Sequence, residues 1–433
     1  MKLRLLSIVV IIAAGIAVLT TSLQGNAAKE HNYQYALAGA RKFADDEVPY
    51  TSVQRYKQAF SIRLGSEEEY REYLEQTKLL GGEFYSSAVK DYVQKYPESS
   101  QAREDLCRYY YETKSYLNLL TCANEARIDG LATDQIRDWY LEVYYTFRYL
   151  ATGLEDAQSF LGNVARVKKG GLYGYLSGYG DYLIAPVFLD GSPSLDATAA
   201  VRDEKEWYMV NTEGYKVART SLPVDELSFP SGGKILVGKD GKYGYTDYSL
   251  NISDPLPYDR ATTYKNGVAA VCRSGKWALI NSEEQLITDF IFDDIKLDEY
   301  GTCISYGVVF AKESGKFYMY DKEGKRISDQ GFDNAYPFCG DELAAVKVGD
   351  KWRFIDKTGT QTLKKTFDEA KSFSLGMAPV REGETWGYIN TGGEYRIESQ
   401  FEDAKPFTAN GIAAVLENGT WSYIKLLAYY YGG

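Results

Sequence analysis

A repeat of about 35 residues in the second half of the chain constrains its fold more than any other feature. Each copy has an aromatic residue after a polar turn, which contains glycine in all copies but the second, at Tyr173, Trp207, Tyr243, Trp277, Phe317, Trp352, Trp386 and Trp421. The intervals are 34, 36, 34, 40, 35, 34 and 35 residues, and five of the six tryptophans occupy this position. A fixed period of this length predicts an array of similar structural units.

Within each unit, a short apolar run precedes the turn and an alternating segment follows the aromatic residue, as in GVAAVCRSGKWALIN from Gly267. This pattern is typical of a β-hairpin. A third element with an aromatic residue and an acidic pair follows at Phe292, Phe332, Phe367 and Phe401. Because one small unit cannot bury both of its faces, neighbouring units must stack. We expect a propeller-like array of eight hairpins, with an open β superhelix as the alternative.

These residues carry a resemblance to a known repeat family. Trp386-Gly-Tyr, Tyr173-Gly-Tyr and Tyr243-Gly-Tyr, with Ala-Ala-Val before related positions and segments such as Phe367-Asp-Glu-Ala after them, resemble the WG (KWG) repeats of bacterial proteins. The resemblance covers about 163–425. Other residues replace the glycine of the pair at Ala278, Tyr318, Arg353 and Ser422. Because most members of the family have no assigned activity, the resemblance implies an architecture more than a function.

The segment before the repeats has helical periodicity, with apolar and tyrosine side chains spaced as on one face of a helix. Ser66-Glu-Glu-Glu69 is a capping box, and Gly81-Gly82, Pro97, Gly130 and Gly153 separate the predicted helices. Leu106, Cys107, Tyr110, Ala123 and Ala126 resemble positions of a tetratricopeptide (TPR) repeat. We expect a helical, TPR-like domain of antiparallel hairpins over 29–161, followed by the β-repeat domain over 162–433.

Residues 1–28 are typical of an export segment. Lys2 and Arg4 precede an uncharged run from Leu5 to Leu19, and small polar residues follow. This pattern predicts a signal peptide or, over residues 5–23, an uncleaved membrane anchor with a cytoplasmic N-terminus. The remainder of the chain is then extracellular or part of the cell envelope.

Composition narrows the possible functions. His31 is the only histidine, which argues against a nucleophile–histidine enzyme and against histidine-rich metal sites. The formal net charge is 49 − 60 = −11, which argues against nucleic-acid binding. The five cysteines show no framework, and only Cys107 and Cys122 are close enough in sequence to consider as a pair, which the sequence leaves open.

The recurring acidic pairs, such as Asp293-Asp294 and Asp368-Glu369, raise the possibilities of calcium binding and glycosidase catalysis. We interpret them as turn and strand-edge residues because they recur once per unit. A carboxylate-based enzyme predicts one unit with an acidic cluster unlike the others, and we identify none. No phosphate-binding loop motif is present. We therefore predict no catalytic, cofactor-binding or metal-ligating residues and assign the eight repeat aromatics to structural anchors.

These features predict a non-catalytic repeat protein that offers binding surfaces to proteins at the cell envelope. A cell-wall glycan or peptidoglycan-binding module is the alternative, and a carboxylate-based hydrolase is the least favoured. Any ligand surface is expected to use aromatics outside the repeat positions, such as Tyr179, Tyr182 and Tyr300.

Overall fold

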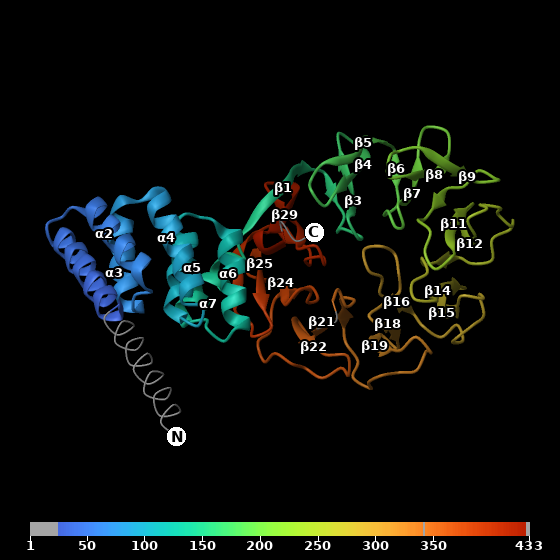
Figure 1. Ribbon diagram of the computed structural model, residues 1–433. Helices are drawn as coiled ribbons and strands as arrows, with labels where there is room; N and C mark the ends of the chain where they lie inside the picture. Colours follow the sequence, from blue (N-terminus) through green and yellow to red (C-terminus); the bar gives the residue numbers. More distant parts are fainter. Residues whose placement is uncertain (1–24, 341–342, 430–433) are drawn as a thin grey trace, which may run out of the picture. The chain divides into compact units, whose positions relative to one another are not determined.

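The protein divides into two compact units, residues 1–143 and 144–433, in a computed structural model that describes residues 25–340 and 343–429. The first unit is helical and the second is built of small antiparallel sheets (Figure 1). The predicted export segment falls mostly on residues 1–24, outside the described residues. Within the described chain, no helix is long and apolar enough to cross a membrane.

The helical unit contains seven helices among its described residues. They are residues 25–45, α2 (Pro49–Ile62), α3 (Glu67–Leu80), α4 (Gly82–Lys95), α5 (Ser100–Glu112), α6 (Tyr116–Ile128) and α7 (Asp134–Tyr144). The predicted capping box begins α3: Ser66 Oγ accepts from Glu69 N, and Ser66 N donates to Glu69 Oε2 at 2.6 Å. Successive helices from α2 to α6 pack against each other as hairpins. The TPR-like assignment stays a prediction.

Tyrosine rings fill the core of this unit. Tyr70 stacks between Phe60 and Tyr92, with ring centroids 5.2 and 5.3 Å away. The hydroxyl groups of the buried rings reach carboxylates at the rim: Tyr70 donates to Asp91 at 2.6 Å, and Tyr92 donates to Glu67 at 2.8 Å. Burial is the main cause that raises the pKa of Tyr70. Much of the tyrosine content of this half therefore serves packing and polar anchoring at once.

The second unit is an eight-bladed β-propeller. Blades 1 to 4 comprise, in order, β2 (Asp156–Ala157), β3 (Val164–Lys169), β4 (Leu172–Ser177) and β5 (Tyr182–Phe188); β6 (Asp190–Gly191), β7 (Thr198–Arg202), β8 (Trp207–Asn211) and β9 (Lys216–Arg219); β10 (Glu226–Leu227), β11 (Ile235–Lys239) and β12 (Lys242–Thr246); and β13 (Arg260–Ala261), β14 (Val268–Arg273) and β15 (Lys276–Asn281).

Blades 5 to 8 follow the same plan. They comprise β16 (Asp294–Ile295), β17 (Ile304–Ser305), β18 (Val308–Glu313) and β19 (Lys316–Tyr320); β20 (Asn334–Ala335), β21 (Ala344–Val348) and β22 (Lys351–Ile355); β23 (Glu369–Ala370), β24 (Met377–Glu382), β25 (Thr385–Asn390) and β26 (Tyr395–Phe401); and β27 (Asp403–Ala404), β28 (Ile412–Glu417) and β29 (Thr420–Leu426). In every blade a two-residue strand pairs with the first strand of the predicted hairpin.

Strand β1 (Phe147–Leu154) closes the ring. It pairs antiparallel with β29, from Phe147 opposite Leu426 to Leu154 opposite Trp421, and so becomes the outer strand of blade 8. A hydrophobic cluster lies at each of the eight interfaces between neighbouring blades, including the interface of blades 8 and 1. The array is therefore a closed propeller and not an open superhelix (Figure 1).

This strand corrects the predicted domain boundary. Residues 145–161 were expected to belong to the helical domain, but helix α7 ends at Tyr144 and the β unit begins there. Since the partner of β1 lies at the far end of the chain, no local pattern identifies it as a strand. The boundary lies between residues 143 and 144 and not between 161 and 162.

The glycine of the WG pair has a steric role in blades 1 and 7. A Cβ atom on Gly174 would lie 2.7 Å from the carbonyl oxygen of Ile184 in β5, and one on Gly387 would lie 2.7 Å from that of Ile397 in β26. Both outer strands shift register as they cross the glycine. Blades 4, 5 and 6 each have two isolated outer bridges in place of a paired strand, and the position of the glycine holds Ala278, Tyr318 and Arg353. Blades 2 and 8 have the outer strands β9 and β1 but carry Tyr208 and Ser422 at this position, and blade 3 keeps Gly244 without an outer strand, so the departures from the family pattern do not follow the outer strand alone.

Candidate functional site

The repeat aromatics lie at the blade interfaces. Five of them are buried, namely Trp207, Trp277, Phe317, Trp352 and Trp386, and three are half-buried, namely Tyr173, Tyr243 and Trp421. In blades 5, 7 and 8 a lysine from the inner turn lies over the ring: Lys296 over Phe317, Lys371 over Trp386 and Lys405 over Trp421, with 4.7 to 5.2 Å from Nζ to the ring centroid. These rings are occupied by packing and by neighbouring cations.

In four units the acid that follows Tyr258, Phe292, Phe332 or Phe367 joins adjacent blades. Its carboxylate accepts a hydrogen bond from the lysine that stands just before the repeat aromatic residue of the preceding blade. Examples are Lys351 to Asp368 at 2.5 Å and Lys242 to Asp259 at 2.6 Å. The second oxygen of Asp368 accepts from the Gly383 amide at 2.9 Å in the turn of its own blade. The Gly383 amide and Lys351 hold the pKa of Asp368 below its usual range. The acids therefore act as turn and blade-linking residues.

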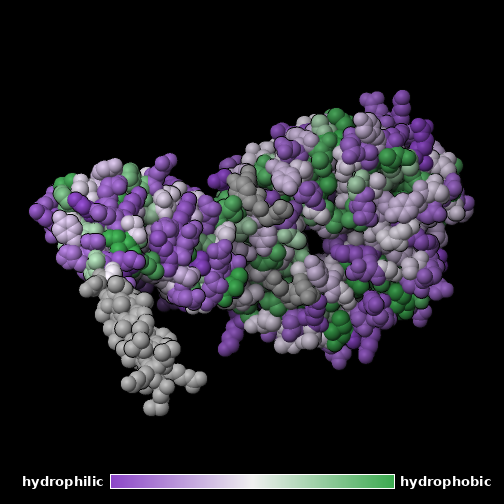
Figure 2. Space-filling model, viewed as in Figure 1, coloured by the Kyte–Doolittle hydropathy of each residue, from purple (hydrophilic) through white to green (hydrophobic). Residues whose placement is uncertain are grey.

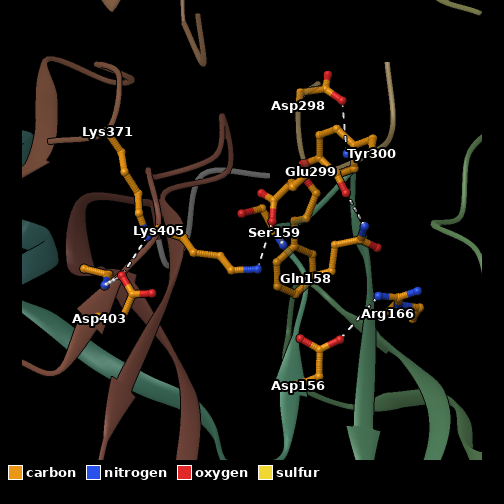
Figure 3. A network of polar contacts seen from close by, with 12 residues as sticks. Asp156, Gln158, Ser159, Arg166, Asp298, Glu299, Tyr300, Lys371, Asp403 and Lys405 are labelled. Carbon is orange, nitrogen blue, oxygen red and sulfur yellow. Dashed lines mark hydrogen bonds and ion pairs between the residues drawn. The ribbon is translucent and has the colours of Figure 1, made fainter. Parts of the chain in front are cut away.

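The long interval of 40 residues between Trp277 and Phe317 produces the main irregularity of the propeller. The loop between β16 and β17, residues 296–303, leaves blade 5 and reaches blades 8 and 1 across the ring. We call it the plug loop. Glu299 Oε2 accepts from Ser159 N at 3.2 Å and from Lys405 Nζ at 2.9 Å (Figure 3). The amide of Gln158 donates to the Glu299 carbonyl oxygen at 2.9 Å.

Neighbouring residues of the plug loop hold it in the same place. Tyr300 donates its hydroxyl to the carbonyl oxygen of Phe160 at 2.9 Å, and burial raises its pKa well above the usual range. Asp298 accepts from Lys265 Nζ at 2.9 Å and from the Thr302 amide at 2.9 Å. Asp298 and Glu299 form an acidic pair unlike those of the other units, which the sequence analysis did not identify. Both carboxylates are bound by lysines and backbone amides.

Two cavities, each of about 400 Å³, adjoin the plug loop. One is lined by inner turns of blades 1, 5, 6 and 8, including Phe160, Tyr336, Phe338 and Phe407. The other lies on the side of blades 1 to 4 and includes Arg166, Asp225 and Thr263. Figure 2 shows the propeller hollowed at its middle. Tyr300 lines both cavities, so the predicted ligand-binding aromatic is part of a structural plug with space on each side.

An apolar surface runs along the outer strands of blades 1 and 2. Its side chains are exposed although they are large and hydrophobic: Tyr182, Leu183 and Val187 on β5, Leu189 after it, and Tyr215 and Val217 at β9. We call this set the apolar edge. In Figure 2 a green strip of hydrophobic residues lies where Figure 1 labels β5. Gly214 in the turn before β9 lies against Ile184, so the two blades contribute to one continuous surface.

The same position in blade 7 shows that the fold does not require this apolarity. Strand β26 pairs with β25 in the register that β5 uses with β4: Phe401 opposite Trp386 and Ile397 opposite Tyr388 correspond to Phe188 opposite Tyr173 and Ile184 opposite Tyr175. Where β5 has Leu183, Ala185 and Val187, β26 has Arg396, Glu398 and Gln400. The outward positions of one blade are apolar and those of the other are polar on the same backbone plan.

The predicted aromatics outside the repeat fall in different environments. Tyr179 is 70% exposed and Tyr182 is 42% exposed, both at the outer side of blade 1, while Tyr300 lies inside the ring. In the described residues, no group of three or more histidine, cysteine or acidic side chains is placed to hold a metal ion. Cys107 and Cys122 lie side by side with 3.2 Å between their sulfur atoms and are not bonded.

The geometry agrees with a match to a family model. The family described as "WG containing repeat" matches residues 255–277, 319–352, 352–386 and 386–421. This is a WG repeat-containing protein. The last three matches of the WG repeat each end on an anchor, Trp352, Trp386 or Trp421, and the first ends on Trp277. The same spacing extends to Tyr173, Trp207, Tyr243 and Phe317, the anchors of blades 1, 2, 3 and 5, which lie outside the matched residues and complete the ring.

No curated protein matches the sequence of this WG repeat protein. Among solved structures, Kluyveromyces lactis Hsv2 is similar at 11% identity and a TM-score of 0.37, covering 61% of this chain and 93% of the other. A eukaryotic initiation factor is similar at 10% identity and a TM-score of 0.42, covering 65% of this chain and 87% of the other. The N-terminal domain of Nup159 is similar at 10% identity and a TM-score of 0.34, covering 64% of this chain and 95% of the other. Likenesses at these scores carry no argument about function.

Proposed function

We propose that this WG repeat protein is a non-catalytic binding protein that presents the apolar edge to protein partners at the cell envelope. The contrast between blades 1 and 7 supports this proposal, because one backbone plan carries exposed apolar residues in one blade and polar residues in the other. Contiguous exposed apolar surface on a soluble unit is typical of interaction sites. Blade 7 shows that polar residues satisfy the fold at these positions.

The outer position of β5 favours a protein partner. Pro186 lies within this strand, and proline, which cannot donate a hydrogen bond to a sheet ladder, is characteristic of edge strands. Tyr182 and Tyr215 add large aromatic area at low conformational cost, a composition that is enriched at protein interfaces. Asp181 and Lys216 border the apolar side chains and supply a polar rim.

The test grafts the residues of blade 7 onto blade 1. The variant Leu183→Arg, Ala185→Glu and Val187→Gln is compared with the unaltered chain by crosslinking and affinity capture in the native envelope. A matched control carries Glu398→Gln and Gln400→Glu on β26. We expect the unaltered chain and the control to capture the same proteins and the graft to lose them. Equal capture by the graft would exclude the apolar edge as the binding surface.

A second candidate, cell-wall glycan binding, is favoured by the exposed tyrosine rings at the same side of the propeller. Tyr179 is 70% exposed and Tyr215 is 71% exposed, and aromatic faces stack on sugar rings. Sedimentation with purified cell wall separates the two functions. Retention that is lost on Tyr179→Ala and Tyr215→Ala but kept in the β5 graft supports the glycan function over the protein-binding function.

A further inference from the structure

Two buried thiols face each other in the helical unit. Cys107 in α5 is fully buried and Cys122 in α6 is 4% exposed, and their sulfur atoms are 3.2 Å apart. A disulfide bond is about 2.05 Å long, so the sulfurs need to approach by about 1 Å. Among the described residues, no other pair of cysteine sulfurs is in hydrogen-bond contact.

The hairpin of α5 and α6 places the two thiols at about the same distance from the connection between the helices. Residues 113–115 connect α5 and α6. Cys107 lies five residues before the last residue of α5, and Cys122 lies six residues after the first residue of α6. At about 1.5 Å of rise per residue, both are about 8 Å along their helices from the connection. The fully buried Ala126 and nearly buried Ala123 let the two backbones approach closely.

We propose that Cys107 and Cys122 form a disulfide bond between α5 and α6 when a small disulfide oxidant, such as oxidised glutathione, reaches the protein. In the structure the Cys107 thiol donates its hydrogen bond to the Cys122 sulfur. That bond lowers the pKa of Cys122 and raises the pKa of Cys107, which makes Cys122 the better nucleophile. Cys122 is also the more exposed of the two.

The reaction has two balanced steps. The Cys122 thiolate attacks one sulfur of the oxidant, forms a mixed disulfide and releases one thiol. Cys107 then loses its proton and attacks the Cys122 sulfur, which forms the bond within the protein and releases the second thiol. In sum, two cysteine thiols and one oxidant disulfide give one protein disulfide and two free thiols. The product covalently joins two helices that packing and the ion pairs of Arg103 with Glu125 and Asp129 hold together in the reduced protein.

The proposal is independent of the apolar edge and of any partner. It predicts that a disulfide bond joins α5 and α6 wherever the chain enters an oxidising compartment, such as the space outside the cytoplasm. It also distinguishes this pair from Cys272 and Cys303, which lie in one buried cluster of the propeller without the sulfur–sulfur contact that joins Cys107 and Cys122. A disulfide stabilises chiefly by restricting the unfolded chain.

The test uses the full chain refolded with oxidised glutathione and, separately, with dithiothreitol. Free thiols are alkylated under denaturing conditions and the peptides are mapped by mass spectrometry. We expect Cys107 and Cys122 to be protected, joined to each other and lighter by two hydrogens, while Cys272, Cys303 and Cys339 are alkylated. Full alkylation of Cys107 and Cys122, or glutathione retained on either, would overturn the proposal.

Thermal unfolding followed by the helical circular dichroism signal supplies the second measurement. The oxidised protein should unfold at a higher temperature than the reduced protein, and Cys107→Ser and Cys122→Ser should each abolish this difference. The double variant Cys107→Ala and Cys122→Ala controls for loss of the thiols themselves. An oxidant-dependent rise that persists in the double variant would assign the effect to other cysteines. The peptide map of the unaltered chain decides the matter even where a variant fails to fold.

Discussion

Blades 1 and 7 are built on one plan and differ in what they show to solvent. Both carry the glycine of the WG pair, both have an outer strand that shifts register across it, and both place an isoleucine opposite a buried tyrosine. Their outward residues are Leu183, Ala185 and Val187 in blade 1 and Arg396, Glu398 and Gln400 in blade 7. The repeat therefore specifies the inner contacts of a blade and leaves its outer face free to vary. We therefore expect the functional residues on this variable outer face.

The shared glycines should give the largest effect on stability. Gly174→Ala and Gly387→Ala each place a Cβ atom 2.7 Å from backbone of the outer strand, so we expect losses of about 3 kcal/mol. Arg353→Ala is the control, because blade 6 has no full outer strand at that position. Urea unfolding followed by tryptophan fluorescence reports the propeller, which holds five of the six tryptophans. A loss in only one of the two blades would show that their plans differ.

The isoleucines should differ in effect because their burial differs. Ile397 is 4% exposed and packs in the cluster between blades 7 and 8, whereas Ile184 is half-buried. We expect Ile397→Ala to lower the free energy of unfolding by about 2 kcal/mol. Ile184→Ala should cost about half as much, measured in the same way. Equal losses would mean that the edge of blade 1 is packed as tightly as that of blade 7.

Exchange of the outward residues should leave stability nearly unchanged. The reverse graft, Arg396→Leu, Glu398→Ala and Gln400→Val, alters exposed or half-exposed positions of β26. We expect a change in the free energy of unfolding within about 0.5 kcal/mol. Urea unfolding checks this, and size-exclusion chromatography shows whether the new apolar face causes association. A large loss of stability would show that the polar side chains of blade 7 support the fold.

The acids that precede the two blades should give the smallest effect, and it should depend on pH. The Gly383 amide and Lys351 lower the pKa of Asp368 in the folded protein. The charged carboxylate therefore stabilises the folded protein fully above the unfolded pKa of about 3.9. This stabilisation is lost as the pH falls through the pKa of the folded protein. Asp368→Asn should therefore destabilise slightly at pH 7 and not at pH 2, by urea unfolding at both values. Glu155, whose carboxylate accepts the Gly171 amide and has no lysine partner among the described residues, serves as the comparison through Glu155→Gln. A loss for Asp368→Asn that persists unchanged at pH 2 would contradict the role of its charge.

The repeat made most of the propeller predictable. The spacing of eight aromatics predicts eight units, and alternation around Trp277 or Trp352 predicts the hairpins that the structure contains. The strand at 147–154 escaped prediction because its pairing partner lies at residues 420–426, and local periodicity carries no trace of it. Closure of the ring rests on that pairing, on the cluster between blades 8 and 1, and on hydrogen bonds between these blades, such as the one from the Tyr423 hydroxyl to the Gln158 carbonyl oxygen.

The site was less predictable than the fold. The interval of 40 residues was visible in the sequence, but only the ring geometry shows that its extra residues reach Ser159 and Lys405. The apolar edge was visible only in part, as Tyr182, because exposure of Leu183 and Val187 depends on which strand is outermost. Sequence periodicity identifies what repeats, whereas the candidate surfaces lie where the repeat varies.

The closing strand has a consequence for the order in which the protein assembles. Residues 147–154 are the first β segment to be synthesised, and their partner at 420–426 is nearly the last. Until the C-terminal strand is made, β1 has an unpaired edge and blade 1 has no neighbour on one side. Contacts so distant in sequence slow folding because the loop between them must close first. The nascent chain therefore exposes the unpaired backbone groups of β1 through almost the whole translation of the propeller. Chaperone binding or early export would have its largest effect during this period.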